Sequence, residues 1–195
     1  AACARALAAR FDLPEVVGRI LALRGVGEAE AETFLDPRLR TSLPDPSTLH
    51  DMDRAAERLA AAVHRGERVG LISDYDVDGC TSAALVQRWA SAVGVETVLR
   101  IPHRLHDGYG PSERLVDELI QAGCRLLLVL DSGINAYGPL DHAADGGLDV
   151  VVVDHHRADA ELPRAHAVVN PNRRDEDGRL GGLAAVGVTF LLLVA

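Results

Sequence analysis

From residue 67 onward, short apolar runs alternate with longer segments of helical spacing, and this alternation limits the possible fold more than any other feature. The predicted strands are RVGLIS, ETVLRI, RLLLVL and LDVVVV at residues 68–73, 96–101, 125–130 and 148–153, with one further candidate at 165–170. Helical patterns lie between them and mostly end at glycine. Strands buried on both faces have near-continuous apolar sequences. The pattern therefore predicts an α/β fold, with a doubly wound parallel sheet and helices on both faces.

The composition shows what the core of such a fold must contain. Of the 195 residues, 48% are hydrophobic but only 4% are aromatic, so Leu, Val, Ile and Ala must build the core.

Residues 1–50 predict a short helical N-terminal segment and a Pro- and Asp-rich surface linker that continues to residue 53. We expect a catalytic domain over residues 51–195. An apolar helix predicted from residue 183 runs to the last residue, which favours a domain truncated at its C-terminal end.

Charge and cysteine usage narrow the class of protein. The formal net charge is −9, and an acidic surface repels nucleic-acid phosphates. All 20 basic residues are arginine, which is suited to bidentate phosphate contacts. The three cysteines lie far apart without a CxxC pair, which argues against disulfides and zinc–thiolate sites and predicts a reducing, cytoplasmic location. Every apolar run is too short to cross a bilayer, so no membrane association is expected.

The segment DYDVDG at residues 74–79 places aspartates at alternate positions after the first predicted strand. An EF-hand loop beginning at Asp74 would need a bidentate glutamate at its twelfth position, where this chain has Leu85. Such a loop also follows a helix, so the calcium interpretation fails. One aspartate can cap the helix expected to begin near Cys80 or Thr81, but capping needs only one carboxylate. Like charges gathered in one loop are unfavourable unless a cation offsets them, which favours a metal site.

Further acidic and imidazole side chains directly follow two other predicted strands. Asp131 comes after RLLLVL, and the run Asp154, His155 and His156 comes after LDVVVV. Loops at the carboxyl ends of parallel strands converge on one crevice, where open α/β sheets bind ligands. Adjacent histidines can also form an ordinary solvated turn, but their place at a strand end favours a role in a site. The predicted site consists of Asp74, Asp76, Asp78, Asp131, Asp154, His155 and His156.

The side chains of this predicted site indicate which metal it would bind. Carboxylates dominate, histidine contributes and cysteine is absent, which favours Mn²⁺ or Mg²⁺ over structural zinc. Several carboxylates can hold two ions about 4 Å apart, a separation suited to attack on phosphorus. Bound cations would also reverse the local charge that a phosphate meets, so the acidic composition is compatible with such a substrate.

The loop IPHRLHDGYGPS at residues 101–112 is a candidate substrate-binding segment. His103 and Arg104 can donate hydrogen bonds to phosphate, and Gly108 and Gly110 allow close approach of a backbone. Tyr109 can stack or donate a hydrogen bond. An ordinary surface turn before the next helix explains the same residues equally well, and the pattern alone leaves both interpretations open.

The order DYDVDG, LDSGI and VDHH resembles the motif order of the DHH phosphoesterase superfamily. The flanking segments SLPDPSTLHDMDRA, PHRLHDGYG, VVNPNR and AAVGVTF are more specific, and they resemble the RecJ family of bacterial single-strand-specific exonucleases. The resemblance runs from about Phe11 to the end of the chain. It implies a DHH-type domain and a metal-dependent exonuclease that digests single-stranded DNA from 5′ to 3′ into mononucleotides, in DNA repair and recombination.

Matching positions then imply individual roles. Asp76, Asp78, Asp131 and His155 would bind Mn²⁺ or Mg²⁺. Asp74 and Asp154 would support these ligands as catalytic residues, and His156 would face the scissile phosphate. The family also places another metal-ligand aspartate and a second domain beyond the last residue here. A helicase or a single-strand-binding protein is the partner expected for such a family.

Two other functions remain open from the sequence. A DHH-type phosphoesterase could act on short oligonucleotides, cyclic dinucleotides or pyrophosphate, because the bare superfamily motifs also serve such enzymes. A catalytically inert nucleic-acid-binding scaffold would be compatible with the absence of the last expected ligand. Chain-length preference distinguishes the first of these from an exonuclease, and strand binding without turnover would indicate the second.

Overall fold

A computed structural model describes residues 2–195, which form two compact units that divide between Asp45 and Pro46. The first unit contains α1 (Ala2–Arg10), α2 (Glu15–Leu23), α3 (Glu28–Leu35) and the short α4 (Leu39–Ser42). Its small core is built from Leu7, Leu21, Val26 and Ala31. This unit supplies the N-terminal helices that the sequence predicted, and it contains none of the predicted site residues.

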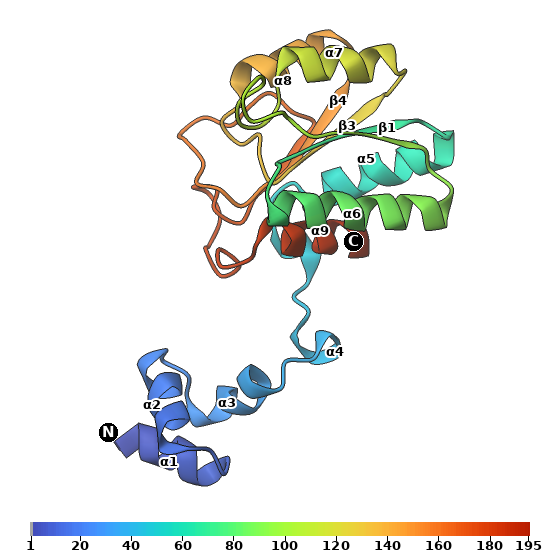
Figure 1. The fold of residues 1–195 in the computed structure, drawn as a ribbon. Helices are drawn as coiled ribbons and strands as arrows, with labels where there is room; N and C mark the ends of the chain where they lie inside the picture. Colours follow the sequence, from blue (N-terminus) through green and yellow to red (C-terminus); the bar gives the residue numbers. More distant parts are fainter. Residues whose placement is uncertain (1) are drawn as a thin grey trace. The chain divides into compact units, whose positions relative to one another are not determined.

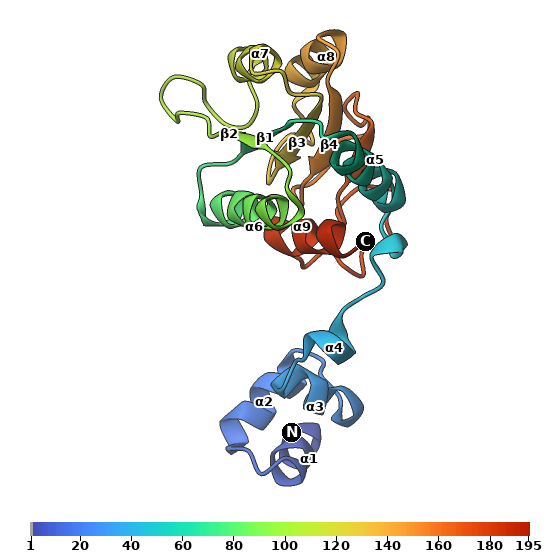
Figure 2. The same cartoon turned by 90° about the vertical axis from the view of Figure 1, so that its right-hand side faces the viewer.

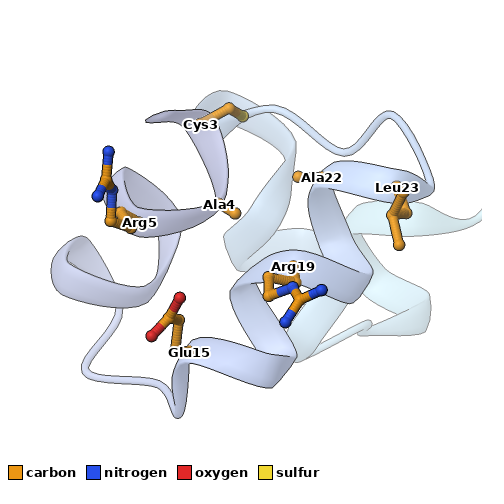
Figure 3. A pocket seen from close by; sticks show the side chains of 7 residues that line it. All are labelled: Cys3, Ala4, Arg5, Glu15, Arg19, Ala22 and Leu23. Carbon is orange, nitrogen blue, oxygen red and sulfur yellow. The ribbon is translucent and has the colours of Figure 1, made fainter. Parts of the chain in front are cut away.

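Helices α1 and α2 of the first unit border a pocket of about 590 Å³ (Figure 3). Its lining residues are Cys3, Ala4, Arg5, Glu15, Arg19, Ala22 and Leu23. The lining mixes both charge signs with small apolar side chains, and it lacks the carboxylate and histidine cluster expected of a metal site.

The second unit contains the predicted alternation of strands and helices. After the 3₁₀ helix η1 (Pro46–Thr48), its elements are α5 (Met52–Arg65), β1 (Val69–Ser73), α6 (Val77–Val93), β2 (Thr97–Arg100), α7 (Glu113–Gln121), β3 (Leu126–Leu130), α8 (Tyr137–Asp145), β4 (Asp149–Val153), β5 (Ala167–Val169) and α9 (Ala185–Val194). Each predicted strand is present and differs from its predicted bounds by no more than two residues.

The five strands form one parallel sheet in the order β2-β1-β3-β4-β5. Helices α5, α6 and α9 cover one face of it, and α7 and α8 cover the other (Figures 1 and 2). Strand β3 is buried along its whole length, which explains its unbroken LLLVL sequence. The doubly wound architecture predicted from the sequence is confirmed.

The strand order places a switch point between β1 and β3. The chain leaves β1 through α6 on one face of the sheet and leaves β3 through α8 on the other face. Loops that diverge in this way open a crevice at the carboxyl ends of the two strands, which is where doubly wound sheets bind ligands.

Two local predictions are wrong. Helix α6 begins at Val77 rather than near Cys80, because Asp76 is its N-cap and accepts a hydrogen bond from the Gly79 N–H at 2.9 Å. Asp78 therefore lies in the first turn of a helix and not in a loop. The end of the predicted surface linker is also buried, since Leu49 and Met52 pack into the core beside α5.

Candidate metal centre

The register of the sheet aligns the residues that follow four of its strands. Ser73 pairs with Leu130, Leu130 with Val153, and Val153 with Val169, so these strands end at the same level. The next residues continue the ladder: the Asp74, Asp131 and Asp154 amides donate to carbonyls of the adjacent strands at 3.2, 2.9 and 3.1 Å. Neighbouring strands lie about 5 Å apart. One row at the edge of the sheet therefore contains Asp74, Asp131, Asp154 and Asn170.

The turn from β1 into α6 brings two more aspartates to this edge. The Ser73 hydroxyl donates to the Gly79 carbonyl at 2.6 Å and ties the first turn of α6 to the strand end. Only glycine fits at position 79, because a Cβ there would lie 2.4 Å from the Asp74 carbonyl oxygen. The hydrogen bond from Gly79 holds the pKa of Asp76 below its ordinary value.

Two groups of side chains have atoms close enough to bind a common ion. In one group, atoms of Asp74, Asp76 and Asp131 all lie within 4.8 Å of one another, and in the other, atoms of Asp131, His155 and His156 do so. Asp131 belongs to both. Its left-handed backbone, with φ of 56°, is a conformation that aspartate tolerates better than most residues. A carboxylate shared between two groups is the arrangement needed for a pair of metal ions.

The buried carboxylates fit a cation. Asp74 Oδ1 and Asp131 Oδ1 are buried without a hydrogen-bond partner among the described residues. Burial, together with the nearby Asp78 and Asp76 carboxylates, raises the pKa of Asp131 to about 8, and burial also raises that of Asp74. Such groups are costly as bare anions, and a divalent cation would supply both the missing partners and the compensating charge.

The orientation of the His155 ring leaves one nitrogen available to a metal. Its Nδ1 lies 3.1 Å from the Leu183 carbonyl oxygen, which can only accept, so Nδ1 carries the proton. The lone pair is then on Nε2, which lies 3.3 Å from Asp131 Oδ1 and 3.6 Å from Asp78 Oδ2. This arrangement is typical of metal-binding histidines, whose second nitrogen donates to a protein oxygen.

Asp78 also has a structural role. Its two carboxylate oxygens accept hydrogen bonds from the Ala185 and Val186 amides at 2.7 and 2.8 Å, which caps the N-terminus of α9. Asp78 lies beside the His155 ring but belongs to neither of the two closely spaced groups.

Asp154 organises the histidine pair. Its carboxylate accepts hydrogen bonds from the Ile134, His155 and His156 amides and from His156 Nδ1 at 2.7 Å. Burial raises the pKa of Asp154, but these hydrogen bonds, with that of His156 the strongest, outweigh it and hold the pKa below its ordinary value. The same contact raises the pKa of His156, whose side chain is 47% exposed and leaves Nε2 free for a ligand.

The structure brings only part of the predicted substrate loop to the centre. The Tyr109 hydroxyl donates to the Asp131 carbonyl at 3.2 Å and lies 3.3 Å from His156 Nδ1. Arg104 stacks over the Tyr75 ring at 4.7 Å, in the turn after β1. His103 is exposed and stacks on His106, and Gly108 has φ of 82° with open space beside it. These last two residues contact none of the predicted metal ligands.

A pocket of about 410 Å³ adjoins the centre on the side of His156 and Tyr109. Its lining residues are Tyr109, Gly110, Pro111, Gly133, Ile134, Asn135, Ala136, Pro139, Asp154 and His156. The lining is mostly apolar and includes a few polar side chains, a composition typical of sites for small organic groups.

Sequence reasoning missed two asparagines beside the histidines. The Asn170 side chain donates to the His156 carbonyl at 2.9 Å, and the Asn172 side chain donates to the His155 carbonyl at 2.5 Å. Two signals could have found them: Asn170 is the last residue of the final predicted strand, and both asparagines lie in VVNPNR, one of the segments that carry the family resemblance.

Fold and site together define the class of protein: a doubly wound α/β protein with a carboxylate and histidine cluster at the switch point of its sheet. The chain belongs to the DHH family, because the model of the DHH family, N-terminal domain, matches residues 68–194. Within residues 2–195, no helix combines the length and apolarity needed to cross a membrane.

Curated relatives of the chain are exonucleases. It is 37% identical over 185 residues to the single-stranded-DNA-specific exonuclease RecJ of Salmonella typhimurium, covering 94% of this chain and 31% of the relative. The RecJ of Bacillus subtilis is 30% identical over 188 residues, covering 96% of this chain and 24% of the relative. The chain thus spans less than a third of the length of these relatives.

Solved structures show the same similarity. The structure of RecJ from Thermus thermophilus in complex with Mn²⁺ has a TM-score of 0.75 and 29% identity, covering 98% of this chain and 26% of that one. A structure of exonuclease RecJ bound to manganese has a TM-score of 0.68 and 34% identity, covering 74% of this chain and 37% of that one.

Proposed function

We propose that this chain is the metal-binding catalytic part of a RecJ-like nuclease, which hydrolyses single-stranded DNA from 5′ to 3′ into mononucleotides. The observation that carries the proposal is the pair of closely spaced groups at the switch point of the sheet, in which Asp131 lies near Asp76 in one group and near His155 in the other. The RecJ relatives supply the reaction type and the substrate class.

The proposed roles are those that the matching motif positions imply. Proposed metal ligands for Mn²⁺ or Mg²⁺ are Asp76, Asp78, Asp131 and His155, and the solved RecJ structures with Mn²⁺ support this choice of metal. Proposed catalytic residues are Asp74, Asp154 and His156, and proposed substrate-binding residues are His103, Arg104, Gly108 and Tyr109. Each of the two groups contains Asp131 with one further proposed ligand, Asp76 or His155, which supports a pair of ions.

When bound, the metal would supply a water of lowered pKa and stabilise negative charge at phosphorus. The chain's own residues would arrange the reacting groups around it. Asp154 accepts from His156 Nδ1 and raises the pKa of the ring, so that the protonated ring can donate a hydrogen bond from Nε2 to a phosphate oxygen. The Tyr109 hydroxyl contacts the Asp131 carbonyl and His156, so it would help to hold this side of the site in place.

The test uses this chain with Mn²⁺ and single-stranded DNA labelled at either end, with a duplex of the same sequence as a control. We expect mononucleotides from the 5′ end of the single strand and none from the duplex. Asp131→Asn replaces the carboxylate with an amide of nearly the same shape and should abolish the release of mononucleotides. Asp141→Asn changes an exposed aspartate on α8 and should leave release unchanged. Equal release from Asp131→Asn and the wild type would contradict the proposal.

Other outcomes would identify the alternatives. Faster hydrolysis of dinucleotides than of long strands would indicate a small-substrate phosphoesterase, which the pocket of about 410 Å³ beside His156 could serve. Tight strand binding without turnover would indicate an inert scaffold. The cytoplasmic location and the helicase or single-strand-binding partner stay predictions.

A further inference from the structure

We infer that Asn172 is a positioning residue of the metal centre, which sets the proton position and the metal affinity of His155 through the segment after β5. The inference rests on the proposed function in one respect, because it takes His155 as a metal ligand. Asn172 contacts no ligand atom itself. Its role follows from what its side chain connects.

The side-chain amide of Asn172 bridges two carbonyl groups far apart in the sequence. Its Nδ2 donates to the His155 carbonyl at 2.5 Å and to the Gly181 carbonyl at 3.3 Å. These two bonds use both of its N–H groups. The Asn172 backbone amide donates to the Asn170 side chain at 2.8 Å, and Asn170 is fully buried. The backbone of Asn172 is therefore fixed by Asn170, and its side chain connects the His155 segment to the Gly181 segment.

The Gly181 segment leads directly to the group that fixes the His155 ring. Leu183, two residues later, presents the carbonyl oxygen that accepts from His155 Nδ1. By joining the His155 backbone to the Gly181 backbone, Asn172 determines the separation between the imidazole and this carbonyl. Gly181 itself packs tightly against Asn172, since a Cβ there would lie 2.8 Å from Asn172 Oδ1.

The position of one proton follows from this separation. When Leu183 accepts from Nδ1, the lone pair stays on Nε2, which points toward Asp131 and Asp78. If the carbonyl moves away, His155 loses the partner that selects this tautomer, and the proton can move to Nε2. Nε2 must then lose that proton before it can bind a metal. Loss of such an outer partner typically weakens metal binding about 10- to 100-fold.

The first readout is metal-free and independent of activity. The ¹⁵N shifts of the His155 side chain distinguish the two tautomers, and His155→Gln identifies its signals among the eight histidines. The spectra are recorded at a pH of about 8, where most imidazoles are neutral. We expect the Nδ1–H tautomer in the wild type and a mixture of tautomers in Asn172→Ala. Asn172→Ser, a smaller change that keeps one donor, should lie between them.

The second readout is Mn²⁺ affinity by calorimetry, with Gln87→Glu as the matched control. Gln87 is an exposed side-chain amide on α6, so this change should leave Mn²⁺ affinity unaltered. Asn172→Asp replaces the donor by an anionic acceptor facing two carbonyls, and we expect about 10- to 100-fold weaker binding. Far-UV circular dichroism and the fluorescence of Trp89 verify folding of each variant.

The outcomes separate this inference from the proposed function. An unchanged His155 tautomer in both Asn172→Ala and Asn172→Ser would overturn the inference, as would equal Mn²⁺ affinity in Asn172→Asp and the wild type. Absence of Mn²⁺ binding in every variant would contradict the proposed function. In that case the tautomer measurement would still decide whether Asn172 positions His155.

Discussion

The tight turn between β1 and α6 gives the sharpest test of how the sheet positions the aspartates. A Cβ at residue 79 would lie 2.4 Å from the Asp74 carbonyl oxygen and 2.8 Å from its carbonyl carbon. Both are backbone atoms, so no flexible side chain can move aside. Gly79→Ala should therefore separate the first turn of α6 from the end of β1.

The expected free energy is found by comparison with a matched glycine. Gly138 occupies the first turn of α8, as Gly79 does in α6, but a Cβ there meets nothing within 4 Å. The helix propensity of alanine favours both substitutions, by at most about 1 kcal/mol. The difference between the two variants isolates the steric term, which is about 1–3 kcal/mol for overpacking. Gly79→Ala should be less stable than Gly138→Ala by this amount.

The assay is urea unfolding followed by tryptophan fluorescence. Trp89 on α6 is the one tryptophan of the chain and packs against the sheet core, so its signal reports on the second unit. We also expect Gly79→Ala to weaken Mn²⁺ binding, since Asp76 and Asp78 lie in the displaced turn. Equal urea midpoints for the two variants, with unchanged Mn²⁺ affinity, would refute the steric argument.

Three further predictions concern side-chain hydrogen bonds and ion pairs that stabilise the second unit. Burial raises the pKa of Asp51, but hydrogen bonds from Val168 and Arg173 outweigh this effect and hold the pKa below its ordinary value. The stability that Asp51 contributes is thus present above about pH 4 and is lost as the pH falls through its folded-state pKa. Asp51→Asn should therefore lower the urea midpoint at neutral pH and make the midpoint depend less on acid pH. Parallel pH profiles for the variant and the wild type would contradict this. Arg58, with 7% of its side chain exposed, forms ion pairs with Glu67 and Asp149. Arg58→Met should lower the free energy of unfolding by about 1–3 kcal/mol. An unchanged urea midpoint would contradict this prediction. Asp107 accepts hydrogen bonds from the His103 amide and from the Arg114 side chain, and these bonds hold the loop at residues 101–110. Asp107→Ala should therefore speed tryptic cleavage in this loop. An unaltered digestion rate would show that these contacts do not hold the loop.

The parts of the fold that the sequence could predict depend on local patterns. Strand β3 is recognisable because burial on both faces requires a continuous apolar run, and Asp131 follows it directly. Convergence of the strand-end residues was predictable because parallel strands end at one edge of the sheet. The helix start at Val77 was not, because DYDVDG offers three aspartates that could each cap a helix, and only the structure shows that Asp76 is the N-cap.

The parts that could not be predicted depend on contacts between distant segments. The Asp78 carboxylate caps α9 from more than 100 residues away, and no local pattern reveals that bond. The Asn172 bridge likewise joins the segment after β4 to the segment before α9. The burial of Leu49 and Met52 follows from packing against the sheet rather than from the Pro-rich sequence around them.

The central claim is that the aligned strand ends form a metal centre, and anomalous diffraction at the manganese edge tests it most directly. Crystals of this chain grown with Mn²⁺ should show anomalous density between Asp131, His155 and Asp76, and none there in Asp131→Asn. Anomalous density confined to other parts of the surface, with none at the ends of β1, β3 and β4, would contradict the account.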